Sequence, residues 1–130
     1  MASGLSTGLA NLWLGTLLNI PYVAPQLCVA MHVGEPGPNG TANPSAVTTR
    51  SQMFLAGPAA GGGGVQVTVT GTPPMWLETA SEVITNISVW DAFTSGHFLW
   101  SALALVPKTV VSGDVVSLTS ATFTFPLLAS

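Results

Sequence analysis

The sequence predicts a mainly β protein: an antiparallel β-sandwich or jelly-roll-like domain over residues 26–130, preceded by one N-terminal amphipathic helix over residues 1–20. Two observations predict this class. Apolar residues recur at helical spacing near the N-terminus, and from residue 26 onward they alternate with a period of two. Turn signals rich in glycine and proline separate the alternating stretches about every ten residues, which is typical of sandwiches and barrels. We therefore expect about seven or eight short strands in one domain, residues 1–130.

The N-terminal helix is predicted from large apolar residues that would share one face. Ser3 or Ser6 could cap its start, and Pro21 would end it. A helix of this length is marginal on its own in water. We therefore expect its apolar face to pack on the chain's own sandwich or on a neighbouring copy. That face consists of Leu5, Leu9, Leu12, Trp13 and Leu17.

The first strand is predicted at Leu27–Val33, where both faces are largely apolar, as in a strand covered on both sides. Residues 34–49 are rich in glycine, proline and asparagine and indicate a long loop. Loops of this length are usually functional or mobile, so we expect this one to be ordered by contact with another chain. A second strand is predicted at 50–55, and the glycine-rich residues 57–64 are expected to form a flexible turn.

The middle and end of the chain continue the same pattern. Residues 65–70 alternate cleanly between valine and polar residues, which predicts a half-buried strand. Residues 71–79 are expected to form a loop in which Met75 and Trp76 tuck inward. Residues 107–113 are predicted as a short edge segment with a turn, and residues 115–128 as one or two final strands.

A hairpin is predicted between the strands 83–90 and 97–105, joined by a turn at residues 91–96. Trp90 and Trp100 stand on either side of that turn and are expected to be largely buried. Asp91, at the start of the turn, can accept hydrogen bonds from turn amides.

Charged residues make up only 5% of the chain, two bases against five acids, whereas an average soluble domain has about 25%. A protein that neutralises nucleic-acid phosphates needs a basic face, so we expect no nucleic-acid partner. The apolar stretch 9–20 is shorter than the roughly 20 residues of a membrane span, so we expect no membrane partner. Because the first 34 residues carry no charged side chain, we expect other protein to cover this surface.

The residues that could carry chemistry do not form a recognisable catalytic or metal-binding pattern. His32 and His97 lack close ligand spacing and are expected to be structural histidines. Cys28 lies in an apolar run and is expected to be a small buried hydrophobe. Glu78 and Glu82 are four residues apart but lie at a boundary between loop and strand. The sequence therefore predicts no enzyme, no cofactor and no metal site.

The four tryptophans leave a carbohydrate-binding function open, as a small carbohydrate-binding β-sandwich, since aromatic rings stack on apolar ligand faces. Trp13, Trp90 and Trp100 fall at core-like positions of the predicted helix and strands. Trp76 lies in a predicted loop beside two prolines, so it is the candidate contact residue.

Several segments, in chain order, resemble small structural proteins of tailed bacteriophages. After the leucine-rich helix, residues 28–37 (CVAMHVGEPG) are similar to a strand and loop of those proteins, and Arg50-Ser-Gln stands where they have an arginine-containing strand. Residues 89–100 (VWDAFTSGHFLW) resemble their hairpin, and residues 110–114 (VVSGD) the turn before their last strands. The chain departs from them at Thr48 and Thr49, where a tyrosine is usual.

The resemblance implies a non-enzymatic virion protein. The favoured function is a minor capsid or decoration protein that binds and stabilises the shell of major capsid protein, with contacts to other copies of itself. The alternative is a tail or tail-fibre-associated module that contacts the host surface. The expected location is the virion, on the capsid surface or on the tail. The candidate interface residues are Leu5, Leu9, Leu12, Trp13, Leu17, Glu35, Pro36, Asn39 and Trp76.

Overall fold

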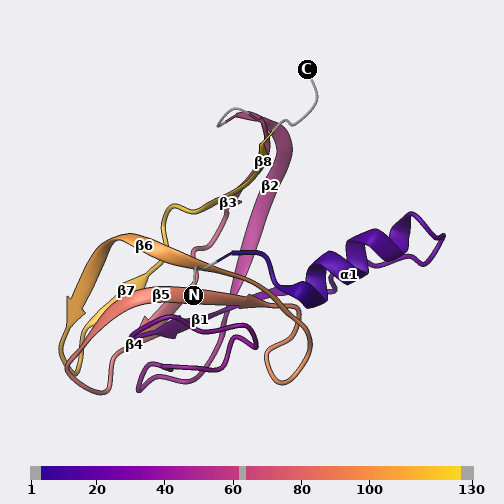
Figure 1. Ribbon diagram of the computed structural model, residues 1–130. Helices are drawn as coiled ribbons and strands as arrows, with labels where there is room; N and C mark the ends of the chain where they lie inside the picture. Colours follow the sequence, from indigo (N-terminus) through magenta and orange to yellow (C-terminus); the bar gives the residue numbers. More distant parts are fainter. Residues whose placement is uncertain (1–3, 62–63, 127–130) are drawn as a thin grey trace.

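The computed structural model describes residues 4–61 and 64–126 (Figure 1). It contains one helix, α1 (Thr7–Thr16), followed by strands along the rest of the described chain. The strands are β1 (Leu27–His32), β2 (Ser51–Gly61), β3 (Gly64–Thr70), β4 (Met75–Leu77), β5 (Glu82–Trp90), β6 (Phe98–Val110), β7 (Val115–Ser117) and β8 (Thr122–Pro126). The predicted mainly β class with one N-terminal helix is confirmed.

Six strands form one sheet in the order β6-β5-β1-β2-β3-β8, and β4 and β7 form a separate two-stranded ribbon. Every neighbouring pair is antiparallel. The sheet is strongly curled, because β2, β3 and β8 rise as an arm away from the part built by β1, β5 and β6 (Figure 1). This curl leaves β6 and β8 as the two edges of the sheet.

The helix α1 is shorter than the expected span of residues 1–20. Ser6 caps its start in an extended conformation, and its Oγ accepts a hydrogen bond from Leu9 N at 2.9 Å. The same hydroxyl donates to Phe98 O at 2.6 Å, which ties the helix start to β6. The helix ends before Pro21 because Asn19, at φ 64°, lies in the left-handed region, where a helix cannot continue. From this anchored start α1 projects away from the sheet (Figure 1).

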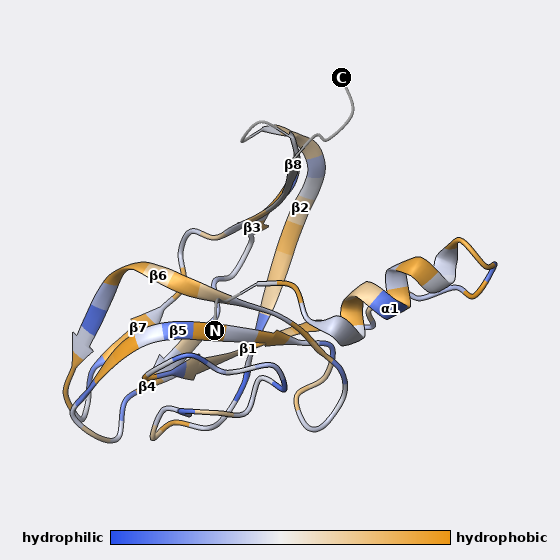
Figure 2. Ribbon diagram, viewed as in Figure 1, coloured by the Kyte–Doolittle hydropathy of each residue, from blue (hydrophilic) through white to orange (hydrophobic). Residues whose placement is uncertain are grey.

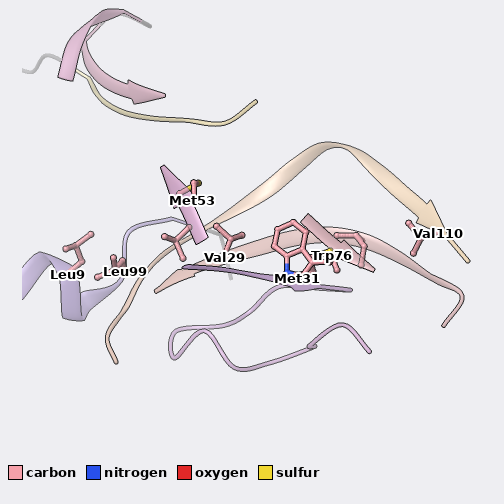
Figure 3. Close-up of a cluster of buried hydrophobic side chains, with 9 residues drawn as sticks. Leu9, Val29, Met31, Met53, Trp76, Leu99 and Val110 are labelled. Carbon is pink, nitrogen blue, oxygen red and sulfur yellow. The ribbon is translucent and has the colours of Figure 1, made fainter. Parts of the chain in front are cut away.

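The core lies where α1, the ribbon and β2 meet the β1-β5-β6 part of the sheet. Val29 and Met31 of β1 are buried on one face, while Cys28 and His32 are buried on the other, as expected for a strand covered on both sides. Val29 and Met31 join the apolar cluster shown in Figure 3, to which the helix and several strands contribute. The cluster contains Leu9, Val29, Met31, Met53, Trp76, Ile84, Val89, Leu99 and Val110.

The predicted flexible turn at residues 57–64 is wrong over its first half. Strand β2 continues to Gly61 and pairs with β3, with a register shift between Ala56 and Ala59. The shift accommodates Pro58, which has no N–H to donate to the ladder. Gly57 is required there because its φ is 109° and a Cβ would lie 3.0 Å from Gln66 O. Residues 62 and 63 of the expected turn lie outside the described residues.

The predicted hairpin is confirmed, since β5 pairs with β6 with Val89 opposite Trp100 and Trp90 opposite Phe98. The predicted edge segment at residues 107–113 is not separate, because β6, an edge strand, runs through Pro107 to Val110, and the predicted turn follows at residues 112–113. A proline is tolerated there for two reasons. Strand β6 is an edge of the sheet, and the pairing with β5 shifts register in the same stretch.

The final stretch forms two strands, one in each sheet: β7 pairs with β4, and β8 pairs with β3. Residues 127 and 128 of the predicted last strand lie outside the described residues. The expected loop at 71–79 contains the short strand β4. Its Trp76 is buried, whereas Met75 is exposed instead of tucked in.

Candidate functional site

The nine candidate interface residues fall into two groups. Leu9, Pro36 and Trp76 are buried inside the chain, so they offer no contact surface, and we correct the expectation for these three. Trp76 packs in the core, and its Nε1 donates to Thr49 O at 3.1 Å. Its burial also removes the candidate contact residue of a carbohydrate-binding site. The partly or fully exposed candidates are Leu5, Leu12, Trp13, Leu17, Glu35 and Asn39.

A second set of apolar residues, mostly absent from the sequence prediction, surrounds the end of α1. We call it the apolar tip, and its five large side chains are between 60% and 83% exposed. They belong to the last part of the helix and the segment after it, where Figure 2 shows several apolar residues. A search for one apolar face misses them, because the helix is apolar all round. The apolar tip consists of Leu14, Leu17, Leu18, Ile20 and Val23.

A cavity of about 460 Å³ opens to solvent beside the inner side of α1. We call it the apolar pocket. It lies between the inner side of α1, residues 22–27, the arm and β6, and nearly all its lining side chains are apolar or aromatic. It is lined by Leu9, Trp13, Tyr22, Ala24, Leu27, Leu55, Pro58, Gln66, Val67, Leu99, Trp100 and Phe123.

Three aromatic rings stack along one wall of the apolar pocket. The Phe123 ring stacks on Trp100, with 4.5 Å between ring centroids, and on Trp13, at 6.0 Å. Phe123 belongs to β8 and Trp100 to β6, which are the two edge strands of the sheet. The stack therefore holds the curled sheet together where the two edges are not paired by the backbone. Trp100 is half-buried as a result, whereas Trp90 is buried as predicted.

His32 has the hydrogen bonds of a structural histidine. Its Nδ1 lies 2.8 Å from Ala42 O, and because a carbonyl can only accept, Nδ1 carries the proton. Its Nε2 can then accept from Ser88 Oγ at 2.7 Å, and that oxygen accepts from Trp90 Nε1 at 2.8 Å. Burial lowers the pKa of His32, so the ring stays neutral, and all three side chains are buried. The serine–histidine pair therefore links β1, β5 and the long loop instead of facing a substrate.

Asp91 organises the hairpin turn, as predicted. Its carboxylate accepts hydrogen bonds from His97 N and Nδ1, both at 2.7 Å, and from the Tyr22 hydroxyl at 2.9 Å. Burial acts to raise the pKa of Asp91, but these hydrogen bonds outweigh it and hold the pKa below its usual value. Burial and the bond to Asp91 raise the pKa of Tyr22 to about 12. His97 therefore serves the turn and not a metal.

Arg50 braces the same turn from outside. Its guanidinium lies 4.0 Å from the centroid of the Trp90 ring and donates to Ala92 O at 2.7 Å and to Ser95 O at 2.8 Å. Both hydrogen bonds come from the same nitrogen, Nη1, and it is the stacking of the planar guanidinium on the ring that favours arginine over lysine here. Arg50 thereby uses one of the chain's two bases for structure.

The buried Glu78 is the least expected group in the structure. It is 1% exposed, and its carboxyl group lies next to that of Glu82, to which it can donate a hydrogen bond while it is protonated. Burial raises its pKa to about 7, and the neighbouring carboxylates of Glu82 and Asp114 act in the same direction. Glu82 accepts hydrogen bonds from Ser45 Oγ and Ala46 N, which outweigh its own burial and lower its pKa. Through these two hydrogen bonds, Glu82 connects the start of β5 to the long loop at residues 34–49.

The arrangement as a whole is rich in apolar surface and poor in free polar groups. No cluster of three histidine, cysteine, aspartate or glutamate side chains within residues 4–61 and 64–126 could hold a metal ion. Over the same residues, no helix is long and apolar enough to cross a membrane. The exposed surface around α1 and β6 is therefore mainly apolar.

Comparison with protein families gives one match, to the family described as Podophage GP4 fiber I protein gp80, over residues 4–125. A search of curated proteins finds no match. The family match runs from the start of α1 to the last described strand, and it confirms the resemblance to structural proteins of tailed bacteriophages. The chain belongs to the family of the podophage GP4 fiber I protein gp80.

Proposed function

We propose that this protein is a non-enzymatic structural module of a bacteriophage fibre, held in the virion by apolar protein–protein contacts. The observation that carries the proposal is the amount of exposed apolar surface on a chain whose whole described length fits a fibre-protein family. Permanent interfaces are more apolar than transient ones and resemble a protein core cut in half. A chain with 5% charged residues is suited to such burial.

The edge strand β6 supports the same function. Leu103 is 68% exposed, Val106 is 80% exposed and Leu105 is fully exposed, all on a long edge of the sheet. A long apolar edge strand is a template for pairing with other chains, and Lys and Pro on an edge work against such pairing. In β6 these two residues, Pro107 and Lys108, stand only near the end of the strand, after its exposed apolar stretch. In a fibre, a neighbouring subunit would cover this edge.

The location is proposed as the fibre and not the capsid shell. The expectation of a capsid decoration protein rested on the sequence resemblance alone, whereas the matching family is described by a fibre protein. The tail-fibre alternative therefore fits better. The non-enzymatic part of the proposal is supported by the hydrogen-bonded, buried positions of Ser88 and His32, the pair that most resembles a nucleophile and its base.

Two measurements on purified virions test the location. Quantitative mass spectrometry should find a few to tens of copies of the chain per particle, and gold-labelled antibody should mark the fibres in electron micrographs. Hundreds of copies per particle, with label over the shell, would instead establish the decoration function and overturn the fibre location.

A further inference from the structure

We propose that the apolar tip of one copy of this chain inserts into the apolar pocket of a second copy. The inference deepens the proposed fibre function. It rests on that function in one respect only, namely that the chain works as part of an assembly. It commits to the protein itself as the partner, because donor and acceptor surfaces of matching chemistry and size lie on the same chain.

The apolar tip is the donor. Its five side chains include Leu17 at 79% and Leu18 at 75% exposed, and no charged residue occurs among the first 34 residues. At roughly 100 Å² for a fully exposed large aliphatic side chain, the tip exposes about 350 Å² of apolar surface. The largest apolar patch of a typical monomer is about 300–600 Å² and is often functional. The tip reaches that scale within residues 14–23.

The apolar pocket is the acceptor. A cavity of about 150 Å³ lined by aliphatic and aromatic groups accepts one benzene ring, so the 460 Å³ of this pocket can hold about three side chains of leucine size. Its walls include Leu55, Val67 and Trp100, and none of its lining residues is charged. Neither surface would therefore leave a charge buried without a partner when they meet.

The tip of a chain cannot fill the pocket of the same chain. Leu9 and Trp13 of α1 line the pocket, and so do Tyr22 and Ala24 on either side of the tip residue Val23. The other tip residues, Leu14, Leu17, Leu18 and Ile20, are exposed and are not among the residues that line it. The Ser6 cap fixes the helix start to β6, and α1 then points away from the sheet (Figure 1). Reaching back would require α1 to unwind.

The tip supplies about half of the apolar area that a specific contact needs. A standard interface buries about 800 Å² on each partner, of which roughly 450 Å² is apolar. The pocket holds about three of the five tip side chains, which together expose about 240 Å² by the same measure, so neighbouring surface on each copy would supply the rest. Since tip and pocket are different surfaces, two copies can exchange tips in a closed dimer, or each copy can pass its tip to the next in a ring or a fibre.

The mass of the full-length chain in solution, measured by analytical ultracentrifugation over a range of concentrations, tests the contact. The wild-type chain should associate. The double variant Leu17→Ser/Leu18→Ser should weaken association a hundred-fold or more, because two large side chains no longer gain by burial. A matched control, Leu77→Ser/Val115→Ser, removes two similarly exposed apolar side chains from the β4–β7 ribbon and should leave association unchanged.

A mixing experiment tests the pairing of the two surfaces. The variant Ala24→Trp places a large ring in the pocket and should also abolish self-association while keeping its tip intact. Mixed with the Leu17→Ser/Leu18→Ser chain, which keeps an open pocket, it should form a one-to-one complex and nothing larger. Circular dichroism and thermal unfolding of each variant establish that it is folded.

Three results would overturn the inference: a wild-type chain that stays monomeric at all concentrations, a tip variant that associates like the wild type, or variants that remain monomeric when mixed. A monomeric chain that binds a different virion protein through the tip would assign that protein as the occupant. Because localisation on virions is measured separately, a fibre protein that is monomeric in solution overturns this inference and leaves the proposed function intact.

Discussion

Replacing Glu78 by glutamine should stabilise the protein at neutral and alkaline pH. The carboxyl group is 1% exposed and lies beside Glu82 and Asp114, and it can donate a hydrogen bond to Glu82 only while it is protonated. Ionising it in this place is unfavourable, because the charge loses water and gains like-charged neighbours. Glutamine has nearly the same shape and carries no charge at any pH.

The size of the effect follows from the pKa shift. Folding raises the pKa of Glu78 from its ordinary value of 4.5 to about 7, and each unit corresponds to about 1.4 kcal/mol. Below pH 4.5 the group is protonated whether the chain is folded or unfolded, so it causes no loss of stability. Between about pH 4.5 and 7 only the folded chain keeps the proton, so stability falls as the pH rises. Above pH 7 the loss is complete, at roughly 3 kcal/mol.

Thermal unfolding followed by circular dichroism at pH 4.5 and pH 8 measures this effect. At pH 8 the Glu78→Gln variant should melt about 10 °C above the wild type, and at pH 4.5 the difference should nearly vanish. The control Glu35→Gln, at an exposed acid of the long loop, should change little at either pH. A Glu78→Gln variant with the same melting temperature as the wild type at pH 8 would refute the conclusion that ionised Glu78 lowers the stability of the folded chain.

Three further predictions follow from the fold. Ser6→Ala removes both the helix cap and the bond to β6, so it should lower the free energy of unfolding by about 1–2 kcal/mol in denaturant titrations, whereas Thr7→Ala should not. Trp90→Ala leaves a cavity under Arg50 and should cost about 3–5 kcal/mol in the same assay; a cost below 1 kcal/mol would contradict a core role for the ring. Because the proposed contacts are apolar, washing virions with 1 M NaCl should leave the chain attached, and its release into the wash on gel analysis would count against apolar attachment.

The sequence predicted that the candidate surface is apolar, but it did not predict which residues form that surface. The lack of charge indicated a covered apolar surface, but the periodicity of Leu5, Leu9 and Leu12 pointed to one helix face as the contact. In the structure Leu9 faces the core, while Leu14 near the end of α1 and Leu18 just after it are exposed. Periodicity could not separate these positions, because both sides of the helix are apolar and only the anchoring at Ser6 decides which side is covered.

The sequence by itself determined the local elements. The period-two pattern, the glycine turns and the serine before the helix predicted the β class, the position of most strands, the hairpin around Asp91 and the structural role of His32. These features depend on neighbours along the chain, which a sequence displays directly.

Only the tertiary structure decided the features that join distant residues. Strand β6 runs through Pro107 because it lies at a sheet edge, and Trp76 is buried because a three-residue strand pairs with β7. The stack of Phe123 on Trp100 closes the curl, and Glu78 meets Glu82 and Asp114 in a buried site. Strand order and burial depend on contacts between residues far apart in the chain, and local propensity carries no information about which of these contacts form.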